Sequence, residues 1–213
     1  MKKNFYFLTI FTLLLITFVS CEKEEQEKNI DSLMPINTGN SWTYKETYHD
    51  YGYIIDTTTT EIGEKISING ISYFSTIPES PNNSRFLCGN DEFGNIVYYG
   101  AISNLDTLIS TSVAYKRDAA LGDKWNYEMV YEDDNSGIFE EEETNVKCIS
   151  TDTLITTPKG SFHCKVYESV INSGKDTFKE YISINIGIVK TEHYEGDYLF
   201  SFGELIDYHL NKK

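Results

Sequence analysis

One motif occurs twice in this chain of 213 residues and constrains its architecture more than any other feature. The motif occurs at 39–44 and again at 122–127, an offset of 83 residues. Its pattern is G-[ND]-x-W-x-Y, where x is any residue. The two copies contain the only two tryptophans of the sequence. Because two copies at so long a period indicate a duplicated multi-strand unit, we predict one repeat over 34–117 and a second over 118–213. The predicted structural anchors of the repeats are Gly39, Trp42, Tyr44, Gly122, Trp125 and Tyr127.

The residues of the first copy alternate in the manner of a β-strand. Trp42, Tyr44, Glu46 and Tyr48 occupy every second position, which predicts a strand with one largely aromatic face. The motif glycine can supply the tight entry into such a strand. Because each tryptophan buries on the order of 200 Å², Trp42 and Trp125 are interpreted as core anchors. An aromatic platform for sugar rings or apolar ligands is the alternative.

Short alternating runs follow along the rest of the chain, separated by clusters of turn residues. The clearest hairpin signal is Asn69-Gly70, because both residue types tolerate the positive φ angles of a two-residue turn. Residues 101–116 are the least regular segment and are predicted as strand, while 138–150 and 153–157 are predicted as two separate strands. No segment has a convincing helical period. We therefore predict an all-β antiparallel meander of two duplicated repeats, arranged as a curved sheet, half-barrel or sandwich.

The N-terminus has the composition of an export signal. Lys2 and Lys3 precede an apolar run over 5–19. As a helix, this run of 15 residues spans roughly 22 Å, less than the ~30 Å hydrocarbon core of a bilayer. The shortfall favours a secretory signal peptide, predicted to cover residues 1–20, over a transmembrane anchor.

The end of this segment resembles the lipobox of bacterial lipoproteins. Phe18-Val19-Ser20-Cys21 has apolar residues, a small residue and a cysteine in the order of that motif, with Phe18 where leucine is usual. The resemblance implies cleavage between Ser20 and Cys21, a diacylglyceryl thioether on the Cys21 sulfur, and usually an N-linked acyl chain such as palmitate. Because two or three acyl chains hold a protein stably on a membrane, we expect permanent attachment through Cys21.

The residues after the lipid cysteine are predicted to form a flexible acidic tether over 21–33, since 22–29 contain no apolar residue to bury. Lys23-Glu24-Glu25 also resembles the surface-export signal of lipoproteins in one large group of Gram-negative bacteria. That resemblance implies display on the outside of the outer membrane. Retention on the periplasmic face is the alternative.

Three features of the chain together resemble a broad class of uncharacterised, β-rich bacterial lipoproteins. They are the G-x-x-W-x-Y start of each repeat, the turn-glycine-x-Phe stretch at 160–162, and the late glycine-containing strand at 187–189. The resemblance covers nearly all of the predicted mature chain. It implies structural roles for the motifs and carries no assigned activity.

The charge of the chain is strongly negative. It has 18 basic and 33 acidic side chains, for a formal net charge of −15. Loss of Lys2 and Lys3 with the signal peptide would leave 16 − 33 = −17. Because such a field repels nucleic acid and anionic headgroups, neither is expected to bind the folded part. The field would attract cations, but the sequence defines no site for them.

Motifs for catalysis and metal binding are missing from the sequence. None of the four histidines lies in a zinc pattern such as H-E-x-x-H, and no G-x-S-x-G elbow occurs. His163 and Cys164 are adjacent, so on a strand they point to opposite faces and cannot form a dyad. Asp133 and Asn135 could offer oxygen ligands to calcium, but EF-hand spacing is absent. We expect no enzyme activity, no cofactor and no metal site.

With Cys21 lipidated, three cysteines remain, which permits at most one disulfide. We expect buried thiols at Cys88, Cys148 and Cys164. A disulfide between Cys148 and Cys164 is the alternative.

Three classes of function remain. We favour a non-enzymatic binding or interaction module anchored in the cell envelope. A carrier or chaperone for an apolar molecule is the first alternative, and a wide apolar cavity would favour it. A hydrolase whose carboxylates meet only in the fold is the second, and two carboxyl groups about 5 to 9 Å apart in a deep cleft would favour it.

Overall fold

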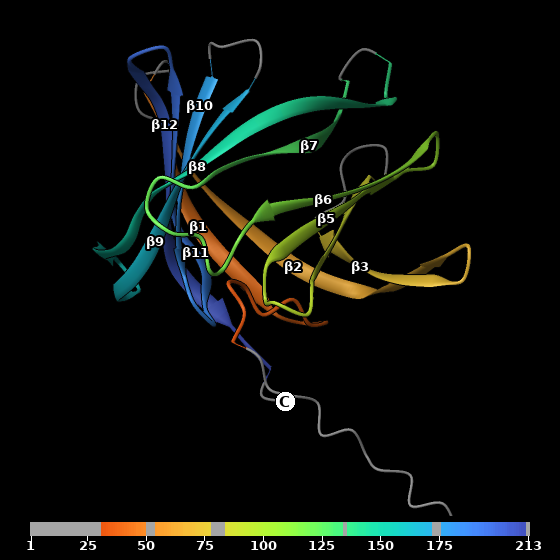
Figure 1. Cartoon of the computed structure of the whole chain (residues 1–213), viewed down its shortest axis with the longest axis horizontal. Coiled ribbons are helices and arrows are strands. Elements are labelled where there is room, and N and C mark those ends of the chain that lie inside the picture. The colour runs from red at the N-terminus through yellow and green to blue at the C-terminus, as the bar shows by residue number, and fades with distance from the viewer. Residues whose placement is uncertain (1–30, 50–53, 78–83, 134–135, 172–175, 212–213) are drawn as a thin grey trace, which may run out of the picture.

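The structure is a computed structural model that describes residues 31–49, 54–77, 84–133, 136–171 and 176–211. Within these residues, twelve β-strands form one antiparallel sheet (Figure 1). The strands are β1 (Ser41–Tyr48), β2 (Ile54–Ile68), β3 (Ile71–Ile77), β4 (Arg85–Asn90), β5 (Ile96–Ile102), β6 (Thr107–Tyr115), β7 (Lys124–Glu132), β8 (Phe139–Thr157), β9 (Gly160–Ile171), β10 (Asp176–Ser183), β11 (Gly187–Glu195) and β12 (Tyr198–His209). The prediction of an all-β antiparallel meander is confirmed.

Several predicted features lie outside the described residues. These are the signal peptide over 1–20, the lipid-bearing Cys21, the tether as far as residue 30, and Asn135 of the predicted turn. The last three residues of the predicted tether, 31–33, belong instead to the folded body, because Leu33 is fully buried. Within the part of the chain that the structure describes, no helix is long and apolar enough to cross a membrane.

The first and last strands of the chain pair with each other. The sheet runs from β6 back to β1, continues through β12 and ends at β7. The register between β1 and β12 shifts once, at a bulge between Thr43 and Tyr44. Figure 1 shows the barrel-like curve that results, with the yellow and green strands of the first half on one side and the blue strands of the second half on the other. Strands β1–β6 and β7–β12 therefore share one continuous sheet with a common interior.

The two outer strands of the sheet, β6 and β7, meet at a seam. In the described residues they form no hydrogen-bonded ladder. Side chains bridge the gap, since Ser112 Oγ donates to the carbonyl of Glu128 at 3.1 Å and Trp125 Nε1 donates to the carbonyl of Ala114 at 3.0 Å. The barrel is thus nearly closed, and side-chain hydrogen bonds hold this seam.

A segment ahead of β1, residues 31–38, crosses one end of the barrel, and we call it the floor segment. The amide of Leu33 donates to the carbonyl of Gly94 at 3.0 Å, in the turn between β4 and β5. The amide of Asn185, in the turn between β10 and β11, donates to the carbonyl of Ser32 at 2.7 Å. The floor segment is therefore tied to one turn from each half of the sheet.

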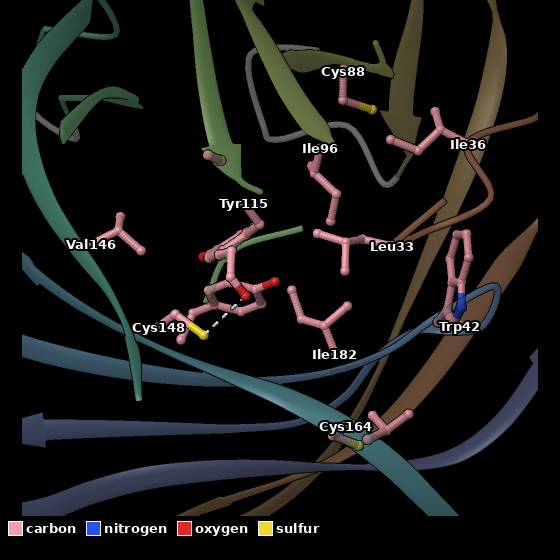
Figure 2. Packing of buried hydrophobic residues seen from close by; sticks show 14 of the residues in the cluster. Leu33, Ile36, Trp42, Cys88, Ile96, Tyr115, Val146, Cys148, Cys164 and Ile182 are labelled. Atoms are coloured by element: carbon pink, nitrogen blue, oxygen red, sulfur yellow. Dashed lines mark hydrogen bonds between the residues drawn. The ribbon is translucent and has the colours of Figure 1, made fainter. Parts of the chain in front are cut away.

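Apolar side chains of the floor segment enter the core. Leu33 and Ile36 are buried and belong to the main hydrophobic cluster. Figure 2 shows Leu33 near the centre of that cluster together with Ile96 of β5, Tyr115 of β6 and Ile182 of β10. The core thus lies inside the barrel, toward the end that the floor segment covers.

The two halves repeat the same backbone contacts at their first strands. The amide of Gly39 donates to the carbonyl of Ile62 at 2.7 Å, and the amide of Ile62 donates to the carbonyl of Asn40 at 2.8 Å. Gly122 and Cys148 are joined in the same way at 2.8 and 2.9 Å. Both glycines have a positive φ, of 81° and 89°, a conformation that favours glycine. The sequence motif therefore marks equivalent backbone geometry in the two halves.

The Asn69-Gly70 turn is confirmed, with φ of 51° and 82° at its two residues. Two predictions of strand boundaries are wrong. The segment 101–116 is not one strand, because β5 ends at Ile102 and a turn, closed by the Ser103 amide donating to the Asp106 carbonyl at 2.8 Å, leads into β6 at Thr107. Residues 139–150 and 153–157, predicted as parts of two strands, belong to a single strand, β8. That strand has irregular register between Cys148 and Thr153, and polar residues at such a bulge have the composition of a turn. The irregularity bends the hairpin of β8 and β9 back over β12, where the Lys159 amide donates to the carbonyl of Leu205 at 3.3 Å.

Candidate functional site

The concave side of the sheet holds two adjoining cavities. One, of about 400 Å³, lies inside the seam, where Phe86 of β4 and Met129 of β7 line it. The other, of about 300 Å³, is lined at its base by Met34 and Ile36 of the floor segment, and we call it the deeper cavity. The residues that line both cavities are Thr60, Thr76 and Tyr98. Volumes of this size are at the low end of the range for small-molecule sites, roughly 300 to 1,000 Å³.

A row of paired positions crosses the inner face of the sheet beside these cavities. Glu46 of β1 pairs with Gly203 of β12, Gly203 with Thr191 of β11, and Thr191 with Glu180 of β10. We call these four residues the carboxyl row. Residues paired directly across strands share one face of a sheet. Since Glu46 and Thr191 line the deeper cavity, both glutamates of the row face the barrel interior.

The missing side chain at Gly203 makes room for the carboxyl group of Glu46. A Cβ atom built on Gly203 would lie 2.6 Å from Glu46 Oε1 and 2.8 Å from Thr191 Oγ1. The Glu46 carboxyl therefore lies over the glycine, on the side of Thr191. Burial raises the pKa of Glu46, the hydrogen bond from Thr58 acts in the opposite direction, and the charge of Asp56 adds to the rise.

Glu180 lies at the other end of the row, against Tyr98 of β5, Tyr115 of β6 and Tyr127 of β7, which we call the tyrosine cluster. Burial raises the pKa of all three tyrosines, and the charge of Glu180 raises them further. The ring centroids of Tyr98 and Tyr127 are 6.1 Å apart. Burial raises the pKa of Glu180 to about 7, although a hydrogen bond with Tyr115 opposes the rise. Its Oε2 atom is buried and has no hydrogen-bond partner among the described residues.

The two motif tryptophans have different surroundings. Trp42 is fully buried, and its Nε1 donates to the carbonyl of Ile186 at 2.6 Å. Trp125 is only partly buried, and Lys116 Nζ lies 5.1 Å from the centre of its ring. The difference follows from the topology, because β1 is flanked by two strands whereas β7 is an outer strand at the seam.

The motif tyrosines both point into the barrel. Tyr44 is buried, lines the deeper cavity, and donates its hydroxyl to the carbonyl of Ile188 at 2.9 Å. Tyr127 is buried in the tyrosine cluster. The repeat motif therefore contributes one tyrosine from each half to the walls of the interior.

The remaining candidate groups lie apart from this interior chemistry. His163 is exposed and its Nδ1 is 2.7 Å from Asp152 Oδ1, whereas Cys164 is buried, so the two neighbours point to opposite faces as expected. The three buried thiols, Cys88, Cys148 and Cys164, are free, and the alternative disulfide does not form. Burial raises the pKa of Cys88 and Cys164 to about 12. Across the described ranges, no group of three or more His, Cys, Asp or Glu residues is placed to hold a metal ion.

Sequence reasoning did not single out the two interior glutamates. The alternating pattern contained the signal for Glu46, which stands on the aromatic face between Tyr44 and Tyr48. Glu180 likewise has phenylalanine and isoleucine two positions before and after it. A carboxylate in the apolar phase of a strand pattern marks an acid that faces inward. No sequence pattern, however, shows that β1 and β10 contribute to one row, because that depends on the pairing of β1 with β12.

No family model matches the chain, and no curated protein matches it. Two solved structures are similar to it. A candidate lipoprotein from Parabacteroides distasonis ATCC 8503 has 13% identity and a TM-score of 0.42, over 85% of this chain and 100% of that one. A candidate exported protein with a YmcC-like fold from Bacteroides fragilis NCTC 9343 has 17% identity and a TM-score of 0.41, over 84% and 100%. At these identities and TM-scores, neither structure bears on what this chain does.

Proposed function

We propose that this protein is a lipid-anchored, non-enzymatic binding protein of the cell envelope that holds a small apolar or amphiphilic molecule inside its barrel. The observation that carries the proposal is the pair of adjoining cavities on the concave side of the sheet. A wide apolar cavity is the feature expected of a carrier, so the proposal places the binding role in the interior. One flank of the larger cavity is formed by Met129 and Val130 of β7, the strand that meets β6 at the seam without a ladder in the described residues.

The anchoring part of the proposal is supported by the sequence. Ser20-Cys21 ends a lipobox-like segment, and acyl chains on Cys21 would hold the protein on a membrane. Lys23-Glu24-Glu25 supports display on the surface of the outer membrane. The described chain begins with the floor segment at residue 31, so the N-terminal side of the sequence, which carries the proposed anchor, leads to the covered end of the barrel.

Binding in the interior can be tested with a matched pair of variants. Thr60 lines both cavities, and Thr60→Phe would fill the space they share. Thr57, three positions earlier on β2, is exposed and pairs with Lys45, so Thr57→Phe adds the same ring to the outer surface. We expect the neutral fluorescent probe N-phenyl-1-naphthylamine to bind the unaltered protein and Thr57→Phe equally, and Thr60→Phe about tenfold more weakly. Circular dichroism of each variant confirms that the sheet is intact.

Equal binding by the two variants would place the probe elsewhere, and no binding at all would remove the interior site. Native mass spectrometry of the delipidated protein, purified from its own host, gives the complementary test. A retained small molecule is the expected result.

The anchor can be tested separately through Cys21. Incorporation of a palmitate analogue and recovery in the membrane fraction are expected for the unaltered chain, and both are expected to be lost in Cys21→Ser. Protease treatment of intact cells then distinguishes the two faces of the outer membrane, because complete protection would contradict surface display.

A further inference from the structure

We propose that the ligand carries an organic cation, an alkylated ammonium group, which binds between Glu46 and Glu180 in the carboxyl row while its apolar part occupies the adjoining cavities. This inference rests on the proposed function, since it names the chemical class of the molecule held in the barrel.

The first support is that two carboxyl groups face the interior without a basic partner. The influences on the pKa of Glu46 are burial, Thr58 and Asp56, and those on Glu180 are burial and Tyr115, so no lysine or arginine of the described residues is among them. A buried carboxylate in its ionised form needs a cationic or hydrogen-bonding partner, and without one the group keeps its proton. A positive group bound beside the two glutamates would supply that partner and favour their ionised forms.

The second support is the unused oxygen of Glu180. Its Oε2 is buried and has no hydrogen-bond partner in the part of the chain that the structure describes. Buried polar atoms in native proteins are nearly always paired, so an unpaired one marks a position where a ligand, an ion or a water can bind. The orphaned oxygen lies on the tyrosine cluster, of which Tyr98 lines both cavities.

The third support is the aromatic character of the walls. Tyr44 and Tyr98 line the deeper cavity together with Glu46. Aromatic rings combined with a carboxylate form the usual recognition site for alkylated ammonium groups, because the ring faces attract a cation that is too weakly hydrated to prefer water. An anionic headgroup would be repelled by both glutamates and by the net charge of −15. A cation is therefore the charged group that fits this interior.

The test compares three ligands that share one tail, n-octyltrimethylammonium, 1-octanol and octanoate, below their micelle concentrations. Each is titrated against the protein loaded with N-phenyl-1-naphthylamine, and displacement gives its affinity. We expect the ammonium compound to bind about tenfold more tightly than the alcohol, and octanoate to bind most weakly. In Glu180→Gln and in Glu46→Gln we expect this preference to fall to about twofold or less. Glu61→Gln removes an exposed carboxyl of β2 and is expected to retain the full preference.

The outcomes separate this inference from the proposed function. Equal affinity for the alcohol and the ammonium compound, or tighter binding of octanoate, would overturn the cation site while leaving a neutral ligand in the barrel. Full preference in both glutamine variants would also overturn it. Absence of probe binding by the unaltered protein would instead overturn the proposed function. The comparison of the three ligands on the unaltered protein needs no variant, so the inference stays testable if a substitution prevents folding.

Discussion

The buried carboxyl of Glu180 gives the folded protein a definite response to pH. Burial raises its pKa from 4.5 to about 7, whereas in the unfolded chain the group keeps its ordinary value. Between these two values the folded state holds a proton that the unfolded state has released. The free energy of unfolding therefore falls as pH rises through this window and is constant, as far as Glu180 is concerned, below 4.5 and above about 7.

The size of the effect follows from the difference between the two pKa values. A pKa difference of about 2.5, at about 1.36 kcal/mol per pKa unit, lowers the free energy of unfolding by about 3 kcal/mol between pH 4.5 and pH 7.5. The groups that face Glu180 do not change charge in this window, because burial raises the pKa of Tyr98, Tyr115 and Tyr127 above their usual range. Glu46 has a raised pKa as well and adds a loss of the same sign.

The measurement is urea unfolding at fixed ionic strength, in steps from pH 4.5 to pH 7.5, on the unaltered protein and on Glu180→Gln. The difference between the two curves isolates Glu180, because every other titrating group is common to both. We expect that difference to change by about 3 kcal/mol across the range, with the unaltered protein losing more stability. The exposed-site variant Glu61→Gln is expected to follow the unaltered protein. Parallel curves for the unaltered protein and Glu180→Gln would refute the claim that this carboxyl is desolvated inside the barrel.

Three further predictions concern the core, the thiols and the floor segment. In urea unfolding, Trp42→Ala is expected to lower the free energy of unfolding by about 3 to 5 kcal/mol, and Trp125→Ala by clearly less, because Trp125 is only partly buried. Equal losses in the two variants would contradict this difference in burial. The three buried thiols are expected to react with a thiol reagent only after unfolding, because burial raises the pKa of Cys88 to about 12, and fast reaction in the folded state would count against this. In Gly94→Ala, a Cβ would lie 2.3 Å from the carbonyl oxygen of Asp31, and the residue would have a φ of +78°. We expect the free energy of unfolding to fall by at least about 1 to 2 kcal/mol, the penalty for the left-handed conformation alone, and proteolysis in the floor segment to become faster. Unchanged protection from proteolysis would show that the floor segment does not pass so close to Gly94.

The sequence was informative wherever a local pattern determines structure. Alternation from Trp42 to Tyr48 predicted β1, and Asn69-Gly70 predicted the turn after β2, because side-chain period and turn geometry depend on neighbours in the chain. The error at β8 has the same origin, since the polar residues of a bulge and of a turn are locally alike. Which strands become neighbours across the barrel depends on contacts far apart in sequence, so the carboxyl row was not predicted.

The tryptophan motif shows how local equivalence can hide a difference. The two copies have the same backbone contacts at their glycines, yet Trp42 is fully buried and Trp125 lies at the seam. The difference arises because one copy begins an inner strand and the other an outer strand of the same sheet. A duplicated sequence thus specifies duplicated backbone geometry, while the position of each copy in the whole sheet specifies the burial of its side chains.

The pairing of β1 with β12 also determines the order in which the molecule can be completed. While only the first half of the chain has folded, β1 has β2 on one side and no neighbour on the other, and it keeps that open edge until β12 pairs with it. Open edges pair readily with those of other chains. A folding chain of this topology therefore depends on protection from aggregation until its final strand is in place, and a truncation before Tyr198 would leave both β1 and β11 permanently open.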